Sequence, residues 1–354
     1  KTQKMITRQL KCNFANESRH SFAQRWPNTR RPLTCHVAAA APDEPSTSGR
    51  MTGQPVATKR QLLGSVALLL STAGTAWADG IGDLESRAFE AYANRDFQQA
   101  SNLLTQIINM EADPATIPRW YEMRAQVLVD GKNFQAALTD FGEALSKTGP
   151  EALTDRARLL AGRALAYEGV SDWKAALADY QQAMDLAALG GESPDPYVVN
   201  SMGNVYASMG MWREAREAYL GSSQLFQQAK GFRGRGGSTT QRLDGAVFAA
   251  SNAALMLAQM GDEEGAVKEM ARIARRAPGS VDMRAALAAL YYHQGLVREA
   301  EDEWEFACDK ITVGCSKYQD VDWLTRVRRW PPVMAARMQA FLKLDGAGLG
   351  KAVL

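Results

Sequence analysis

The sequence predicts an all-α fold, a superhelical stack of about six helical hairpins capped by a C-terminal helix. Three observations predict it. A pattern of small and aromatic residues recurs six times after residue 79. Each copy places a turn between two segments that carry one apolar stripe, as in a helical hairpin. The composition, 46% hydrophobic and 23% charged, supplies enough apolar material for a core.

The charge of the chain is unevenly distributed. Residues 1–78 contain eleven Lys or Arg and three Asp or Glu, which leaves 30 basic and 36 acidic residues of the totals of 41 and 39. The part after residue 78 is therefore acidic overall. A nucleic-acid-binding protein needs a basic face, so the charge argues against nucleic acid as a partner.

The first 78 residues have the composition of targeting segments. Residues 1–58 are rich in Arg, Ser, Asn and Pro and poor in acids, which predicts a disordered chloroplast transit peptide. Residues 59–78 carry a basic pair, an apolar run and small residues, which predicts a signal peptide cleaved after Ala78. Two signals in series predict two membrane crossings and a location in the thylakoid lumen.

Two other interpretations of this segment stay open. An uncleaved membrane anchor is one, but Leu62–Ala78 has seventeen residues, fewer than the roughly 20 needed to span a bilayer. A bacterial periplasmic protein is the other, if translation starts at Met51. The basic pair Lys59-Arg60 does not separate the twin-arginine route from the general secretory route.

The repeats occupy residues 79–310, and residues 311–354 form a C-terminal loop, capping helix and tail. The clearest repeat has these residues in order: Gly203, Tyr206, Gly210, Trp212, Ala215 and Tyr219. Gly203 lets the two helices approach closely, and Gly210 ends the first helix. The second helix of each copy carries one alanine: Ala100, Ala137, Ala176, Ala215, Ala266 and Ala300.

These residues resemble the tetratricopeptide repeat, in which helical hairpins stack into a right-handed superhelix. The alanines are spaced by 37, 39, 39, 51 and 34 residues, and only the last spacing equals the unit length of the family. The longer spacings predict extended helices or loops between hairpins. The resemblance also implies that the first helix of each hairpin lines a groove.

In that register five residues are candidates for binding a partner in the groove: Tyr197, Asn200, Asn204, Phe248 and Asn252. Asn side chains donate and accept, so they can hydrogen-bond the backbone of an extended peptide without reading its sequence. Relatives that hold a chaperone's terminal carboxylate use basic residues where this chain has Asn200, Asp282 and Ala286. An exposed helix face, with Asn204 satisfied locally, is the alternative.

The basic, glycine-rich stretch 229–241 interrupts the helical periodicity and predicts a loop. Its candidate contact residues are Lys230, Phe232, Arg233 and Arg235. They suit an acidic surface or a phosphate, although the stretch lacks the Gly-Lys-Ser/Thr ending of a nucleotide-binding loop. A solvated connector is the alternative.

Cys308 and Cys315 are the only cysteines after residue 78. In an oxidising compartment they predict a structural disulfide that closes a short loop at the end of the repeats. A redox-active dithiol is the alternative, but such sites usually have two intervening residues.

The segment after the second cysteine combines tryptophan and arginine: Trp323, Arg326, Arg328, Arg329 and Trp330. One interpretation is a cap that covers the apolar edge of the last repeat. The other is a docking patch, because Arg and Trp are frequent at protein interfaces and arginine suits anionic lipid head groups. Both hold if the tryptophans point inward and the arginines outward.

Four longer strings resemble the thylakoid lumen tetratricopeptide family of plants and green algae: STTQRLDG (238–245), AASNAALMLA (249–258), AEDEWEFAC (300–308) and TVGCSKY (312–318). The resemblance runs from about residue 80 to residue 344. It implies a lumenal location. It also suggests a role in the assembly or maintenance of photosynthetic membrane complexes.

The sequence predicts no enzyme, cofactor or metal site. After residue 78 the only histidine is His293, and no nucleophile motif, metal-ligand spacing or phosphate-binding loop is present. We therefore expect a scaffold that binds other proteins, namely photosystem subunits or assembly factors, with peripheral contact to the thylakoid membrane. A stably bound auxiliary subunit of a photosystem-type complex is the alternative, and a redox-active dithiol protein is an alternative of another class.

Overall fold

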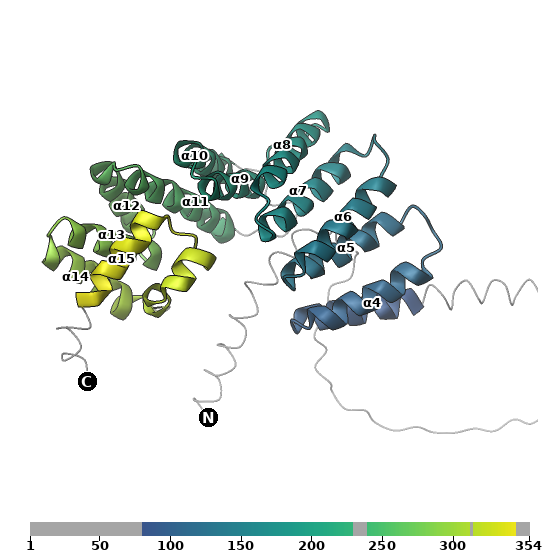
Figure 1. Ribbon diagram of the computed structural model, residues 1–354, viewed down its shortest axis with the longest axis horizontal. Coiled ribbons are helices and arrows are strands. Elements are labelled where there is room, and N and C mark those ends of the chain that lie inside the picture. Colours follow the sequence, from purple (N-terminus) through teal and green to yellow (C-terminus); the bar gives the residue numbers. More distant parts are fainter. Residues whose placement is uncertain (1–79, 229–238, 312–313, 345–354) are drawn as a thin grey trace, which may run out of the picture. The chain divides into compact units, whose positions relative to one another are not determined.

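The computed structural model describes residues 80–228, 239–311 and 314–344. For residues 239–242 and 344 it describes the backbone alone. Within these ranges the chain forms helices and turns, and no strand. It divides into two units, residues 1–112 and 113–354 (Figure 1). None of the described helices is long and apolar enough to cross a membrane.

The described part of the first unit is one hairpin. Residues 80–93 form its first helix, and α4 (Phe97–Met110) forms its second. Asp96 caps α4 by accepting a hydrogen bond from the backbone N–H of Gln99 at 2.9 Å.

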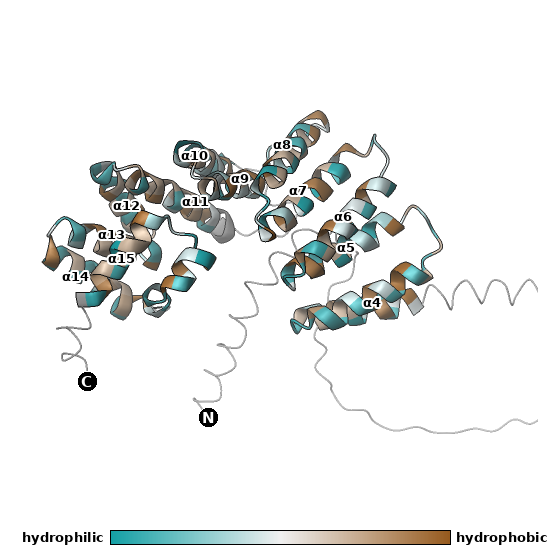
Figure 2. Cartoon of the chain, viewed as in Figure 1, coloured by the Kyte–Doolittle hydropathy of each residue, from teal (hydrophilic) through white to brown (hydrophobic). Residues whose placement is uncertain are grey.

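The second unit contains five hairpins in chain order. They are α5 (Ile117–Asp130) with α6 (Phe134–Lys147), α7 (Leu153–Gly169) with α8 (Trp173–Leu189), α9 (Pro196–Ser208) with α10 (Trp212–Gln228), α11 (Thr239–Gln259) with α12 (Glu263–Arg276), and α13 (Val281–His293) with α14 (Val297–Glu305). Each helix packs against the next one along the chain. Hydrophilic and hydrophobic residues alternate around the helices (Figure 2), as packing between neighbours requires.

Four further elements follow α14. A π-helical turn, η2 (Phe306–Lys310), continues the helix, and a 3-10 turn, η3 (Ser316–Gln319), comes after the second cysteine. A second π-helical turn, η4 (Trp323–Val327), leads to the last helix, α15 (Pro332–Leu344).

All six described hairpins turn in the same way. In each hairpin one residue of the turn has a positive φ: Arg95, Lys132, Ser171, Gly210, Gly261 and Gly295. The next backbone N–H then bonds a carbonyl five residues back, as in Met211 to Tyr206 at 2.9 Å. This is the Schellman ending of a helix, and it reverses the chain within three residues. The six turns are spaced along the sequence as the second-helix alanines are. In every hairpin the turn therefore lies at the same distance from the alanine.

Close packing within the hairpins follows the predicted positions. The six second-helix alanines, Ala100, Ala137, Ala176, Ala215, Ala266 and Ala300, are all 0% exposed. A Cβ atom on Gly203 would lie 2.6 Å from the ring of Tyr219, so only glycine allows α9 and α10 to approach this closely. The predicted all-α fold of stacked helical hairpins is confirmed.

One boundary differs from the prediction. The loop was expected over residues 229–241, but α11 already begins at Thr239. Lys230, Phe232, Arg233 and Arg235 lie outside the described residues.

Candidate functional site

Seven residues of the first helices define the surface that we call the first-helix face: Glu168, Tyr197, Asn200, Asn204, Phe248, Asn252 and Asp282. On α9, residues three, four and seven positions apart share one side of the helix, which places its three members together. The other members are linked by contacts with the C-terminal segment, described below.

The two aromatic candidates are exposed. Tyr197 is 37% exposed and stacks edge-on against Phe226, with 4.9 Å between the ring centroids. Phe248 is 47% exposed, and the guanidinium of Arg328 lies 4.6 Å from its ring centroid. Each ring is therefore held on one side by the protein and reaches solvent on the other.

Asn204 is satisfied within its own hairpin. Its Oδ1 accepts a hydrogen bond from the Tyr219 hydroxyl at 2.9 Å. Burial raises the pKa of Tyr219, so this hydroxyl keeps its proton and remains a donor. Asn200 differs, because its Oδ1 is buried and has no hydrogen-bond partner among the described residues.

Asn252 faces the chain's own C-terminal segment. Asn252 is 4% exposed, and its Oδ1 accepts a hydrogen bond from Nη1 of Arg328 at 2.8 Å. Its amide oxygen is therefore engaged within the chain rather than presented to a partner.

Arg328 is the centre of a buried polar cluster. It is 8% exposed, and its Nε donates to Asp282 Oδ1 at 2.9 Å while Nη2 donates to Oδ2. Trp330 Nε1 donates to the same Oδ1 at 3.0 Å. Burial lowers the pKa of Arg328. The Asp282 carboxylate raises this pKa by more than burial lowers it, so the pKa lies above its usual value.

Arg329 reaches a different hairpin. Its Nη1 donates to Glu168 Oε2 of α7 at 2.7 Å, across 161 residues of sequence. Glu168 is 4% exposed, and its Oε1 accepts from the Tyr180 hydroxyl at 2.7 Å. The C-terminal segment thus connects the last hairpin to the α7–α8 hairpin.

The predicted Arg and Trp patch does not form one surface. Trp330 is buried and Trp323 stacks on Tyr318 at 5.2 Å, which agrees with tryptophans pointing inward. The arginines divide, however: Arg328 is buried, whereas Arg326 is exposed and pairs with Asp322 one helical turn away. The expectation that all three arginines point outward is corrected, because Asp282 and Asn252 hold Arg328 inside.

The last helix lies over the last two hairpins. The backbone N–H of Val333 donates to Gln259 Oε1 of α11 at 2.9 Å, and Arg337 pairs with Glu263. On α13, Ala285, Ala286 and Ala289 are 0% exposed. α15 therefore covers the last hairpin, as predicted, and extends to α11 as well.

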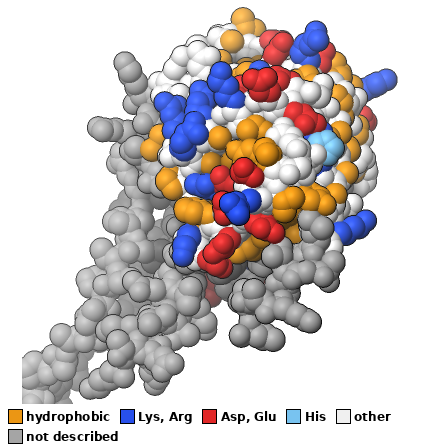
Figure 3. All heavy atoms as spheres, turned by 90° about the vertical axis from the view of Figure 1, so that its left-hand side faces the viewer, with side chains coloured by type: hydrophobic (Ala, Val, Ile, Leu, Met, Phe, Trp, Pro, Cys, Tyr) orange, Lys and Arg blue, Asp and Glu red, His pale blue; other side chains and the backbone are white. Residues whose placement is uncertain are grey.

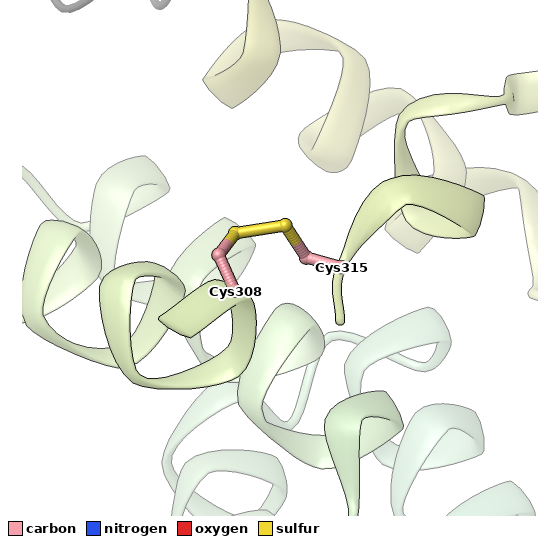
Figure 4. Close-up of a disulfide and its surroundings, with 2 residues drawn as sticks. All are labelled: Cys308 and Cys315. Atoms are coloured by element: carbon pink, nitrogen blue, oxygen red, sulfur yellow. A yellow bond between two sulfur atoms is a disulfide. The ribbon is translucent and has the colours of Figure 1, made fainter. Parts of the chain in front are cut away.

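The disulfide predicted between Cys308 and Cys315 is present (Figure 4). The two Cα atoms are 4.7 Å apart, within the usual range for a bridge. It joins η2 to the residue that precedes η3. Cys315 is 7% exposed, which protects the bond from exchange with external thiols.

We expect the double substitution Cys308→Ser, Cys315→Ser to lower the free energy of unfolding by about 2 to 3 kcal/mol, because the unfolded chain gains the freedom of an open loop. Urea unfolding at equilibrium measures this. The wild-type chain unfolded with a reductant is the control and should lose the same amount. Equal stabilities of oxidised wild type and variant would contradict the prediction.

The sequence analysis missed two ion pairs that hold hairpins together. Arg124 forms two bonds of 2.7 Å with Asp140, and Arg163 forms bonds of 2.7 and 2.9 Å with Asp179. Both pairs join residues 16 apart, and the second lies 39 residues after the first. That recurrence of an Arg and an Asp in the repeat register was the signal. Glu168 and Tyr180 were missed as well.

No group of three or more His, Cys, Asp or Glu side chains is placed to hold a metal ion within the described ranges. Figure 3 views the second unit from the side on which α12–α15 lie. Lys and Arg side chains gather along one edge of this surface, and hydrophobic side chains lie between charges of both signs. This end is thus a mixed surface, unlike the buried cluster around Arg328.

Solved structures with the same arrangement of helices establish the fold. The structure is similar to a tetratricopeptide repeat protein from Parabacteroides merdae ATCC 43184, with a TM-score of 0.50 and 16% identity over 78% of this chain and 96% of that chain. It is also similar to the apo form of RapI, with a TM-score of 0.52 and 9% identity over 77% of this chain and 76% of that chain. The sequence matches no family model and no curated protein at a significant level. The chain therefore has the fold of tetratricopeptide repeat proteins.

Proposed function

We propose that this protein is a non-enzymatic scaffold that binds other proteins through the first-helix face. The observation that carries the proposal is the open part of that face on α9 and α11. Tyr197 and Phe248 are exposed there, and Asn200 Oδ1 lacks a hydrogen-bond partner among the described residues. Aromatic rings supply contact area at low entropic cost. The buried acceptor of Asn200 gains from a donor that a partner brings once its side chain turns outward.

We further propose that it works in the thylakoid lumen, on photosystem subunits or assembly factors. Support comes from the two predicted targeting segments and from the strings that resemble the lumenal family. The disulfide fits an oxidising compartment. Peripheral contact with the membrane is part of the proposal, with the exposed Arg326 as one candidate.

Purification of the tagged chain from detergent-solubilised membranes of its own organism tests this function. Photosystem subunits or assembly factors recovered in substoichiometric amounts support the scaffold. Recovery of one large complex in a fixed, salt-resistant ratio would instead identify an auxiliary subunit. Recovery of the chain alone, from every fraction, would contradict both.

We expect Asn200→Ala to weaken binding of a recovered partner about two- to tenfold, the worth of one hydrogen bond of about 0.5–1.5 kcal/mol. Its melting temperature should not fall, because the removed oxygen has no partner among the described residues of the free protein. Asn204→Ala is the matched control, since it removes the bond to Tyr219 and should lower stability by about 1 kcal/mol. Unchanged binding by the Asn200 variant would remove Asn200 from the binding site.

A further inference from the structure

The first-helix face binds a guanidinium group in two places. In the first, Glu168 accepts from Arg329 and from the Tyr180 hydroxyl. In the second, Asp282 and Asn252 together bind Arg328. Both carboxylates are almost enclosed, with side chains 2% and 14% exposed, so each one needs a cationic partner in the folded protein.

The two places are neighbours in space although three hairpins supply them. Consecutive residues fill them: Arg328 bonds Asp282, and Arg329 bonds Glu168. Two consecutive arginines of one short segment therefore lie across the face from α13 to α7.

The two arginines are held unequally. Arg328 is 8% exposed, lies against Phe248 and bonds two side chains. Arg329 has a side chain that is 40% exposed and makes a single ion pair, with Glu168. Its φ of 59° is the conformation that Lys132 and Ser171 also adopt at the turns of their hairpins. Arg329 is thus the end of the segment that leaves first.

We propose that the first-helix face is a binding site for arginine-containing segments of partner proteins, and that the chain's own Arg328-Arg329 occupies it until a partner displaces it. The inference rests on the proposed function and adds the chemistry of the partner. The part of the chain after residue 78 is acidic, with 30 basic and 36 acidic residues, which suits a basic partner segment.

Arg329→Gly in the full chain opens the first place without disturbing the turn, because glycine adopts a positive φ freely. The probe is a labelled peptide with the sequence of residues 322–333, and fluorescence anisotropy measures its affinity. We expect the variant to bind this peptide at least tenfold more tightly than wild type does. A peptide with citrulline in place of both arginines should not bind, because citrulline has the same shape without the charge.

Glu168→Gln is the matched control, because the amide oxygen still accepts from Tyr180 while the charge is lost. Added to Arg329→Gly, it should return the peptide affinity to the wild-type level. A folded Arg329→Gly variant that binds the peptide no better than wild type, or that binds the citrulline peptide equally well, would overturn the inference.

Hydrogen exchange gives a second measurement that does not depend on added peptide. The backbone N–H groups of Arg328 and Trp330 donate to Trp323 and Leu324 carbonyls at 2.8 and 2.9 Å. In wild type we expect these amides to exchange at least tenfold faster than the most protected amides of α13, because the segment opens locally. Exchange at the same rate as α13 would mean that the segment leaves only on global unfolding, and the inference would fail.

The two proposals can fail separately. If photosystem proteins copurify with wild type but Arg329→Gly gains no peptide affinity, the scaffold function stands and the arginine site falls. If the peptide binds as expected but no protein copurifies, the arginine site stands and the scaffold function in its proposed setting falls.

Discussion

Replacing Asp282 with alanine should lower the free energy of unfolding by about 3–5 kcal/mol, the largest effect we expect from one charged residue. The substitution leaves the Arg328 guanidinium buried without its carboxylate and removes the acceptor of Trp330 Nε1. An uncompensated buried charge is far more costly than a lost surface pair. Urea unfolding followed by circular dichroism measures the difference.

The chain offers a matched control for this prediction. Asp322 and Arg326 form the same kind of pair, but both side chains are more than half exposed. Asp322→Ala should therefore change stability far less than Asp282→Ala does. The double variant Asp282→Leu, Arg328→Met tests the cause, because removing both charges should recover much of the loss. Equal effects of Asp282→Ala and Asp322→Ala would show that burial of Arg328 does not decide the stability.

Phe141→Ala should lower the free energy of unfolding by about 3–5 kcal/mol, because it leaves a cavity between α6 and α7. Phe141 is 1% exposed and packs directly over Gly162, where a Cβ atom would lie 2.5 Å from its ring. Gly162→Ala alone should also destabilise the protein, by about 1–3 kcal/mol, because the methyl group overlaps the ring.

The double variant decides whether this contact is the cause. In the Phe141→Ala background the methyl group of Gly162→Ala has room and alanine favours the helix, so the second substitution should raise stability by about 1 kcal/mol. The change of sign is a coupling between the two sites that a double-mutant cycle measures directly. Additive losses would mean that the two residues do not contact each other as described.

The repeating part of the fold could be predicted because each hairpin carries its own signal. A small residue must lie where two helices approach closely. The recurring alanines at positions 137, 176 and 215 therefore indicate which helices pair within a hairpin. The turns were harder. Gly210, Gly261 and Gly295 show the positive φ in the sequence, whereas Lys132 and Ser171 adopt it without glycine and give no sign.

The candidate site was predicted less completely, because its decisive contacts are not local. Arg328 is separated from Asp282 by 46 residues and from Asn252 by 76. No periodicity connects such positions. In the sequence, Asp282 differs from the basic residue of carboxylate-binding relatives, and nothing there indicates its contact with Arg328. Asn200 and Asn204 show a related limit. Both share one face of α9, but which of them has a partner depends on Tyr219 of the next helix.

The bond between Arg329 and Glu168 also has a consequence during translation. Glu168 is synthesised 161 residues before Arg329. At about 5–20 residues per second, roughly 8 to 30 s pass between the two events. Throughout that interval the chain has no Arg329 to pair with Glu168.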